Sequence, residues 1–384
     1  MSEPRRKLIF LVTEDWYFWS HRLPMARAAQ AAGFDVAVAA RVTAHGERIR
    51  AAGFTLHPLA WQREQLGPLA SLTAIIEIYR LYRRERPFLV HHVAQKAAML
   101  GGIAAMLARV PGVVSIISGI GYVGTSGDRR ARLIGQISRA LWPLLLLRRN
   151  CRVIVQNEDD RRVIAGSQTE AAKRIAIIAG SGVDLDHFRM MPEPPSPPVT
   201  AAYVGRMIAI KGPALLVEAQ QQLQREGIDL RLMLGGPADP ANPSSFDEAT
   251  LTGWSKLKGI TWTGYREDVR TIWAEAQIAV LASLGGEGLP KTLLEAAACG
   301  RAIVATDIPG TRDIARDGVN AILVPPGDVA ALAAALKVLT QDAARRHRYA
   351  EAGRRLTEIH YADPVIMAET ESLYRALTVD VLRA

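Results

Sequence analysis

The sequence predicts an α/β protein with two domains, each built around a parallel β-sheet. Short runs rich in Val and Ile alternate with longer stretches of helical periodicity along all 384 residues. A single hydrophobic core stops growing at roughly 250–300 residues, so this length favours two cores. A proline-rich segment, MPEPPSPP at 191–198, separates two parts that are each of domain size.

The expected strands divide equally between the two parts. In the first they are 7–12, 35–40, 88–91, 113–117, 153–156 and 175–178; in the second they are 200–204, 230–234, 260–263, 278–281, 302–305 and 321–324. Helical stretches such as 24–32 and 213–225 separate them, which is typical of β-α-β units. We therefore expect a Rossmann-like domain at 1–190, a linker at 191–198 and a second Rossmann-like domain at 199–363. A C-terminal helix at about 364–384 could return to the first domain. The alternative for 191–198 is a long surface loop.

Composition and charge exclude several classes of protein. With 22% charged residues and 49% apolar residues, the chain is neither disordered nor fibrous. Two cysteines are too few for a disulfide framework or a Cys-rich metal site, which favours a reducing cytoplasm. Acidic residues follow the first apolar run at once, so it reads as a strand and not as a signal peptide. The most hydrophobic uninterrupted stretch, 141–147, is far short of the ~20 residues that a bilayer requires.

The net charge of +9 is unevenly distributed. Residues 1–190 hold 27 Lys and Arg against 15 Asp and Glu, whereas residues 191–384 hold 20 against 23. The basic first half predicts an anionic partner: a nucleic acid, a membrane surface or a phosphorylated substrate.

The strongest functional pattern is GGEGLPKTLLEAAACGRAIVATDIPG at 285–310. Glu287 lies in a Gly-rich loop after the strand 278–281, and a helix is expected from about 290 to 298. Glu295 lies inside that helix, eight residues after Glu287. A helix N-terminus attracts phosphate through its free N–H groups, and carboxylates accept hydrogen bonds from sugar hydroxyls. The alternative is a capped amphipathic helix with incidental glutamates.

This pattern resembles the E-x7-E signature of the retaining family 4 glycosyltransferases, which have the GT-B fold of two Rossmann-like domains. Four more segments resemble elements of that family: GSGVDLDHF at 180–188, VGRMIAIKGPALLVEA at 204–219, GYREDVRTIWAEA at 264–276 and DGVNAILVPPGD at 317–328. Three segments of the first half, at 18–26, 90–102 and 118–126, resemble a branch that adds sugars to lipid-linked or envelope polysaccharides. The resemblance covers nearly the whole chain.

The resemblance implies a set of site residues. Glu287 would contact hydroxyls of the donor sugar, and Glu295 would hold the ribose hydroxyls of the nucleotide. Arg206 and Lys211 would neutralise the diphosphate, where the charge of the leaving group grows. Further donor-binding residues implied by the same segments are Gly205, Tyr265, Arg266, Gly288 and Leu289.

The resemblance also concerns the catalytic residue of the first domain. Many family members carry a histidine two residues after an apolar strand, in contact with the donor sugar. This sequence has Ile117-Ser118-Gly119 there, which leaves that residue unassigned. His21 and His92 are the substitute candidates, although a histidine at a strand end is more often structural.

The implied activity is the transfer of a sugar, such as an N-acetylhexosamine or related hexose, with retention of the anomeric configuration. The donor would be a nucleotide diphosphate sugar, with UDP favoured over GDP, and no cofactor or metal would be obligatory. The acceptor would be a polyprenyl-diphosphate-linked or other envelope glycan at the cytoplasmic face of the membrane. A GT-B nucleotide-sugar epimerase, a dinucleotide-dependent oxidoreductase and a non-catalytic sugar- or lipid-binding module remain as alternatives.

Three further patterns bear on these alternatives. Gly119–Gly124 fits the dinucleotide pattern G-x-G-x-x-G, but it lies mid-domain and no acidic residue follows ~20 positions later, so a cleft-lining loop is favoured. Asp184-Leu185-Asp186 resembles a metal motif without a Gly-rich cage around it, so we expect Asp184 to be structural.

The segment 129–150 places six arginines around an apolar run containing Trp142, which favours contact with an anionic membrane surface over a core helix. We expect no nucleic-acid partner, because aromatic residues are not interleaved with the basic ones.

Overall fold

The computed structural model describes residues 5–61, 67–119, 148–166, 169–240 and 242–383. The chain divides into two units, the first formed by 1–182 with 363–384 and the second by 183–362. The loop Gly119–Gly124, apart from Gly119, and the segment 129–150, apart from its last three residues, lie outside the described residues.

The first unit contains a parallel sheet of seven strands in the order β3-β2-β1-β4-β5-β6-β7. Its strands are β1 (Arg6–Glu14), β2 (Phe34–Arg41), β3 (Thr55–Pro58), β4 (Leu89–Val93), β5 (Gly112–Ile116), β6 (Cys151–Val155) and β7 (Ile175–Ile177). Its described helices are α1 (Asp15–His21), α2 (Leu23–Ala31), α3 (Gly46–Ala51), α4 (Pro68–Glu85), α5 (Ala94–Ala108), α8 (Glu158–Ala165), α9 (Thr169–Ala172) and α17 (Asp363–Arg383).

The second unit contains a parallel sheet of six strands in the order β10-β9-β8-β11-β12-β13. Its strands are β8 (Val199–Val204), β9 (Leu230–Gly235), β10 (Ile260–Gly264), β11 (Ile278–Leu281), β12 (Ala302–Thr306) and β13 (Ala321–Val324). Its described helices are η1 (Ala209–Lys211), α10 (Pro213–Arg225), α11 (Glu248–Ser255), α12 (Arg270–Glu275), α13 (Lys291–Ala298), α14 (Thr311–Ile314), α15 (Val329–Gln341) and α16 (Ala343–His360).

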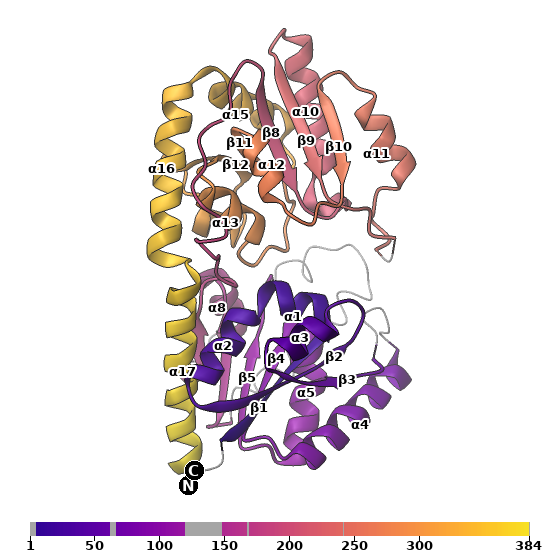
Figure 1. Ribbon diagram of the computed structural model, residues 1–384, viewed down its shortest axis with the longest axis vertical. Helices are drawn as coiled ribbons and strands as arrows, with labels where there is room; N and C mark the ends of the chain where they lie inside the picture. The colour runs from indigo at the N-terminus through magenta and orange to yellow at the C-terminus, as the bar shows by residue number, and fades with distance from the viewer. Residues whose placement is uncertain (1–4, 62–66, 120–147, 167–168, 241, 384) are drawn as a thin grey trace. The chain divides into compact units, whose positions relative to one another are not determined.

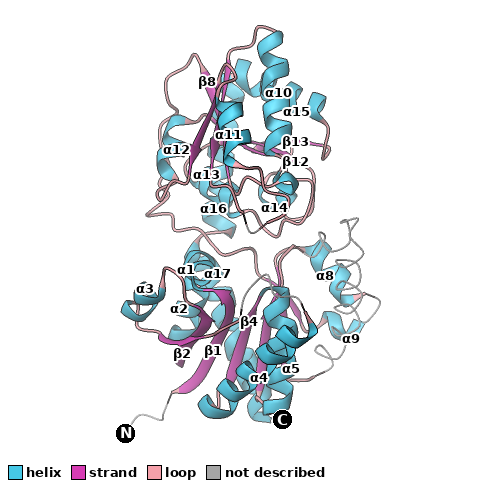
Figure 2. Cartoon of the chain, turned by 90° about the vertical axis from the view of Figure 1, so that its right-hand side faces the viewer, coloured by secondary structure: helices cyan, strands magenta, loops and turns pink. Residues whose placement is uncertain are grey.

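Both sheets are covered by helices (Figure 2). The side chains along each strand point alternately to the two faces of the sheet, and in β1 both sets are apolar. In β1, Leu8, Phe10 and Val12 belong to the cluster that includes residues of α2 and α17, whereas Ile9 and Leu11 belong to the cluster that includes residues of α4 and α5. Successive side chains of a strand point to opposite faces, so a strand that is apolar at every position must be buried on both faces. The predicted fold class of two parallel-sheet, Rossmann-like domains is therefore confirmed, and each of the twelve predicted strands is present.

The C-terminal helix α17 belongs to the first unit. Its Tyr374 and Leu377 are fully buried in the core of that unit, and the Tyr374 hydroxyl lies 2.5 Å from His91 Nδ1. The chain therefore crosses between the units twice, after Gly182 and after Ala362.

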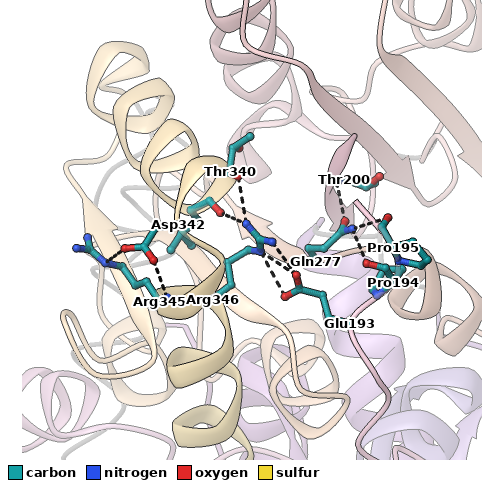
Figure 3. A network of polar contacts seen from close by, with 10 residues as sticks. Glu193, Pro194, Pro195, Thr200, Gln277, Thr340, Asp342, Arg345 and Arg346 are labelled. Carbon is teal, nitrogen blue, oxygen red and sulfur yellow. Dashed lines mark hydrogen bonds and ion pairs between the residues drawn. The ribbon is translucent and has the colours of Figure 1, made fainter. Parts of the chain in front are cut away.

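The proline-rich segment 191–198, which we predicted as the linker, lies within the second unit (Figure 3). Glu193 forms a 2.7 Å ion pair with the buried Arg346 of α16. Gln277 donates to the carbonyl oxygen of Pro194 at 3.1 Å, and its own oxygen accepts from the N–H of Thr200 at 2.7 Å. These contacts hold the prolines against the second sheet. The division between the units falls after Gly182, eight residues before the predicted linker begins.

Candidate functional site

The strand order of the second unit marks where a ligand is expected. The direction in which the strands are added reverses between β8 and β11, which pair in parallel. In open α/β sheets, ligands bind beyond the carboxyl ends of the strands at such a switch point. Arg206 and Lys211 follow β8, and Glu287 follows β11, so three predicted site residues emerge here.

Glu287 is the centre of a buried polar cluster. Its Oε1 accepts a 2.5 Å hydrogen bond from Ser283 Oγ and a 2.6 Å ion pair from Lys211 Nζ. Thr306, the last residue of β12, donates to the carbonyl oxygen of Ser283 at 2.6 Å. Glu287 is only 7% exposed, and its Oε2 accepts no hydrogen bond from the described residues. The carboxylate is thus held by one oxygen, while the other remains available to a hydroxyl donor.

Close backbone contacts bring the loops of this cluster together. Gly212 precedes α10 with a φ of 73°, and a Cβ on it would lie 2.1 Å from the carbonyl oxygen of Ala282. Gly310 has a φ of 80°, and a Cβ on it would lie 1.3 Å from the carbonyl oxygen of Gly288. Only glycine fits at these two positions, which explains the glycines of the Lys-Gly and Pro-Gly sequences. The backbone of the loop that carries Glu287 is therefore in close contact with the loops after β8 and β12.

Glu295 lies inside α13, as predicted, one turn after Lys291. Burial raises the pKa of this carboxyl to about 7, and the Lys291 ammonium, 3.9 Å from Oε1, opposes that rise. The side chain keeps 12% of its surface exposed. A carboxyl poised near neutral pH in a partly open position is a candidate ligand-binding group.

Arg206 is paired with a residue that the sequence did not point to. Its guanidinium forms a 2.7 Å ion pair with Asp239, on the loop that follows β9. The carbonyl oxygen of Arg206 accepts a 2.8 Å bond from the Tyr203 hydroxyl. Burial, and to a smaller extent the Glu287 carboxylate, raise the pKa of Tyr203, so this hydroxyl stays protonated and can donate.

The remaining donor-side candidates lie around the same edge of the sheet. Gly205 follows β8, and its N–H donates to the carbonyl oxygen of Gly235 at 2.9 Å. Leu289 is buried just before α13. Tyr265, at 72% exposure, and Arg266 follow β10 and project to solvent. In the sheet, β9 and β8 lie between β10, which these two residues follow, and β11, which precedes Glu287.

The histidine candidates of the first unit have different surroundings. His92 is fully buried within β4; its Nε2 lies 3.1 Å from the Tyr82 hydroxyl, and its Nδ1 lies 3.4 Å from Ser115 Oγ. Burial lowers its pKa to about 3, so the ring is neutral at physiological pH. These contacts make His92 a core residue, and we withdraw it as a catalytic candidate. His21 is half-buried at the end of α1, stacked on Tyr17, with Nδ1 2.6 Å from Ser20 Oγ.

Two sequence expectations concern metals. Asp184 accepts hydrogen bonds from the N–H groups of Asp186 and His187, both at 2.9 Å, which is the structural role that we predicted for it. In the part of the chain that the structure describes, no three His, Cys, Asp or Glu side chains gather as a metal site requires. A reaction without an obligatory metal stays a prediction.

Sequence reasoning missed Ser283, Thr306 and Asp239, which support the candidate residues. Ser283 and Thr306 are polar residues at the carboxyl ends of strands, and that position could have drawn attention to them. Asp239 carries no such signal, because it lies 33 residues from its partner Arg206 in a loop without a recognisable pattern.

Two family models match the chain, one for each unit. Residues 7–157 match the model described as "Glycosyl transferase 4-like", and residues 198–342 match "Glycosyl transferases group 1". Together they include β1 and β4 of the first unit and the Glu287 cluster of the second.

Curated relatives and solved structures agree with these matches. The capsular polysaccharide biosynthesis glycosyltransferase CapM of Staphylococcus aureus is 20% identical over 83% of this chain and 84% of its own length. The UDP-Gal:alpha-D-GlcNAc-diphosphoundecaprenol alpha-1,3-galactosyltransferase of Escherichia coli is 24% identical over 71% of this chain and 72% of its own. Among solved structures, Anabaena Alr3699/HepE in complex with UDP and glucose superimposes with a TM-score of 0.77 at 17% identity, covering 96% of this chain and 99% of that one. Sucrose-phosphate synthase of Thermosynechococcus elongatus gives 0.79 at 19% identity, with 98% and 100% covered. The chain is a glycosyltransferase with the GT-B fold.

Proposed function

We propose that this glycosyltransferase retains the anomeric configuration and moves a hexose or N-acetylhexosamine from a UDP-sugar to a polyprenyl-diphosphate-linked or other envelope glycan acceptor. The reaction would take place at the cytoplasmic face of the cell membrane. The observation that carries the proposal is the contact of Lys211 with Glu287 at the switch point between β8 and β11. That contact joins a cation suited to phosphate with a carboxylate suited to sugar hydroxyls.

Each residue of the cluster has a role in this proposal. The open Oε2 of Glu287 accepts a hydrogen bond from a hydroxyl of the donor sugar. One of the three N–H groups of the Lys211 ammonium donates a hydrogen bond to Glu287, and the other two can donate to diphosphate oxygens. Arg206 supplies the second cation, and Glu295 accepts hydrogen bonds from the ribose hydroxyls.

The proposed step breaks the bond between the anomeric carbon of the donor and the diphosphate oxygen. A new bond forms on the same face of the sugar between that carbon and the acceptor oxygen. The proton of the attacking hydroxyl passes to the leaving diphosphate, so atoms and charge balance. Negative charge grows on the diphosphate during this step, and preorganised cations stabilise it.

The relatives support the substrate classes. The name of one gives UDP-galactose as donor and a diphosphoundecaprenol-linked sugar as acceptor, and HepE was solved with UDP and with UDP-glucose. The name of CapM places it in capsular polysaccharide synthesis. The structure adds one fact about membranes: none of the helices in the described ranges is both long and apolar enough to span a bilayer.

Thermal shift with a panel of UDP- and GDP-sugars tests the donor, and product analysis on polyprenyl-diphosphate-linked acceptors tests the transfer. We expect a UDP-sugar to raise the melting temperature and the product to keep the donor's anomeric configuration by NMR. Glu287→Gln should abolish transfer, whereas the control Glu351→Gln, at an exposed position of α16, should not. Full turnover by Glu287→Gln, or an inverted product, would contradict the proposal.

A further inference from the structure

The helix α4 of the first unit carries an unusual solvent face. We define the α4 outer face by seven exposed residues that follow Pro68, the first residue of the helix: Leu69, Leu72, Thr73, Ile76, Arg80, Arg83 and Arg84. At 100° per residue they lie within an arc of roughly 120°. The opposite side of the helix, with Ala74, Ile78, Leu81 and Tyr82, is buried in the core. Figure 1 shows α4 on the outside of its domain.

The first half of the α4 outer face is apolar. Leu69 is 80% exposed, Leu72 54% and Ile76 39%, and Leu69 is the most exposed large apolar side chain among the described residues. Exposed apolar residues are common singly, but the water-facing stripe of a helix in a soluble protein is normally polar. Three of them in consecutive turns form a contiguous patch, which indicates a binding surface.

The second half of the α4 outer face is cationic. Arg80 and Arg83 form no ion pair with any carboxylate in the described ranges, and Arg84 contacts Glu85 at 2.9 Å. Glu85 already binds Lys7 at 2.7 Å, and the hydrogen bond from Lys7 is the largest of the effects that lower its pKa to about 2. The acid at the margin of the face, Glu77, accepts a hydrogen bond from the N–H of Ala60. The face therefore offers guanidinium groups beside leucine and isoleucine.

We infer that the α4 outer face docks the first domain onto an anionic lipid bilayer. An interfacial helix of this kind inserts its apolar side chains among the acyl chains while its arginines reach acidic headgroups. The charge is complementary to a lipid surface, and the exposed leucines distinguish that surface from a nucleic acid, which would need no apolar contact. This face is separate in sequence from 129–150, the segment in which we expected membrane contact.

The position of α4 suits this role, an argument that rests on the proposed lipid-linked acceptor. The helix connects two parallel strands, β3 and β4, so it runs antiparallel to them and begins at the carboxyl edge of the sheet. Leu69 and Leu72 lie at that end. Ligands of α/β sheets bind at the carboxyl edge, so docking through α4 brings the acceptor-binding edge near the bilayer that holds the polyprenyl chain.

Sedimentation of the full chain with vesicles tests the inference, with phosphatidylcholine vesicles compared with vesicles that also contain phosphatidylglycerol. We expect binding to the anionic vesicles that 0.5 M NaCl weakens. L69S/L72S/I76S and R80Q/R83Q/R84Q should each lower the partition coefficient at least tenfold. The matched controls V319S/I359S/L382S and R225Q/R348Q/R355Q change exposed residues elsewhere and should bind like the wild type.

Two further measurements distinguish a failure of the docking inference from a failure of the proposed function. Transfer to a short, water-soluble acceptor should be unchanged in both α4 variants; if no acceptor is glycosylated at all, the proposed function fails while vesicle binding still tests the surface. Cys151 and Cys299 are buried, so an environment-sensitive dye on Leu72→Cys reports insertion without the multiple variants. Its emission should shift to the blue on anionic vesicles, and the same dye on Ile359→Cys should not respond. Absence of wild-type binding, unchanged binding by the α4 variants, or no shift at Leu72→Cys overturns the inference.

Discussion

The buried Glu295 makes a prediction about stability and pH. Burial raises its pKa to about 7 from an ordinary 4.5, only partly opposed by Lys291. The folded protein therefore binds this proton more tightly than the unfolded chain does. The associated stability is fully present below about pH 4.5, is lost as the pH rises to about 7 and stays lost above that. The difference corresponds to about 3 kcal/mol, at 1.36 kcal/mol per pH unit.

Glu295→Gln removes this dependence because an amide does not titrate. Urea unfolding of both proteins at pH 5 and pH 8, followed by tryptophan fluorescence, measures the effect. The free energy of unfolding of the wild type, relative to that of the variant, should fall by about 2–3 kcal/mol between the two pH values. The exposed Glu351→Gln should show no such trend. A relative stability that stays constant from pH 5 to pH 8 would refute the burial argument.

Nucleotide binding should respond in the opposite direction. If Glu295 accepts hydrogen bonds from ribose hydroxyls, UDP favours the ionised carboxylate and binding releases a proton. The affinity for a UDP-sugar, whose diphosphate diester has no group that titrates in this range, should then rise between pH 6 and pH 8 in the wild type and stay flat in Glu295→Gln. Calorimetry in buffers of different ionisation enthalpy measures the number of protons released on binding. Release of no proton at pH 6 would show that Glu295 does not bind the nucleotide.

Further predictions concern the remaining site residues. Arg206→Ala and Lys211→Ala should each lower kcat/KM at least a hundredfold, since a single preorganised contact to developing charge is worth about 3 kcal/mol; near-normal rates would exclude a diphosphate role. Ser283→Ala should lower kcat roughly tenfold or more by freeing Glu287 while donor KM changes little, and an effect confined to KM would contradict this positioning role. His92→Ala should lower the melting temperature, whereas His21→Ala should lower the rate without destabilising the fold; a stable but inactive His92→Ala would reverse our assignment. Transfer should survive EDTA, and a loss restored by Mg²⁺ or Mn²⁺ would return attention to Asp184.

The fold could be predicted because its strands are buried on both faces. Strands such as Ile278–Leu281 and Ala302–Thr306 are short apolar runs between helical stretches, and such runs stand out in a sequence. The missed strand, β3, has the sequence TLHP and lies at the edge of its sheet, where half of its backbone groups need no partner. Four mixed residues at an edge give neither alternation nor a continuous apolar run, so no local pattern could reveal them.

The site was predictable only where its residues are close in the sequence. The spacing of Glu287 and Glu295 follows from one loop and one helix, whereas the pairing of Glu287 with Lys211 spans 76 residues and depends on the strand order. His92 shows how a small boundary error changes a role. We expected the strand to end at His91, but it continues to Val93, which places the His92 side chain in the core and not beyond the sheet.

The residues that hold Glu287 in place come from the ends of three neighbouring strands. Lys211 comes from the connection after β8, Ser283 follows β11, and Thr306 ends β12. A carboxylate on a Gly-rich loop could rotate freely, but here Oε1 is fixed from two directions, and the carbonyl of the fixing serine is itself held by Thr306. A group that must distinguish sugar hydroxyls gains from such preorganisation, because less ordering is left to occur when the donor binds. The same arrangement keeps the Lys211 ammonium beside Glu287 before any phosphate arrives, so the charges that would bind the donor sugar and stabilise its leaving group are positioned by one network.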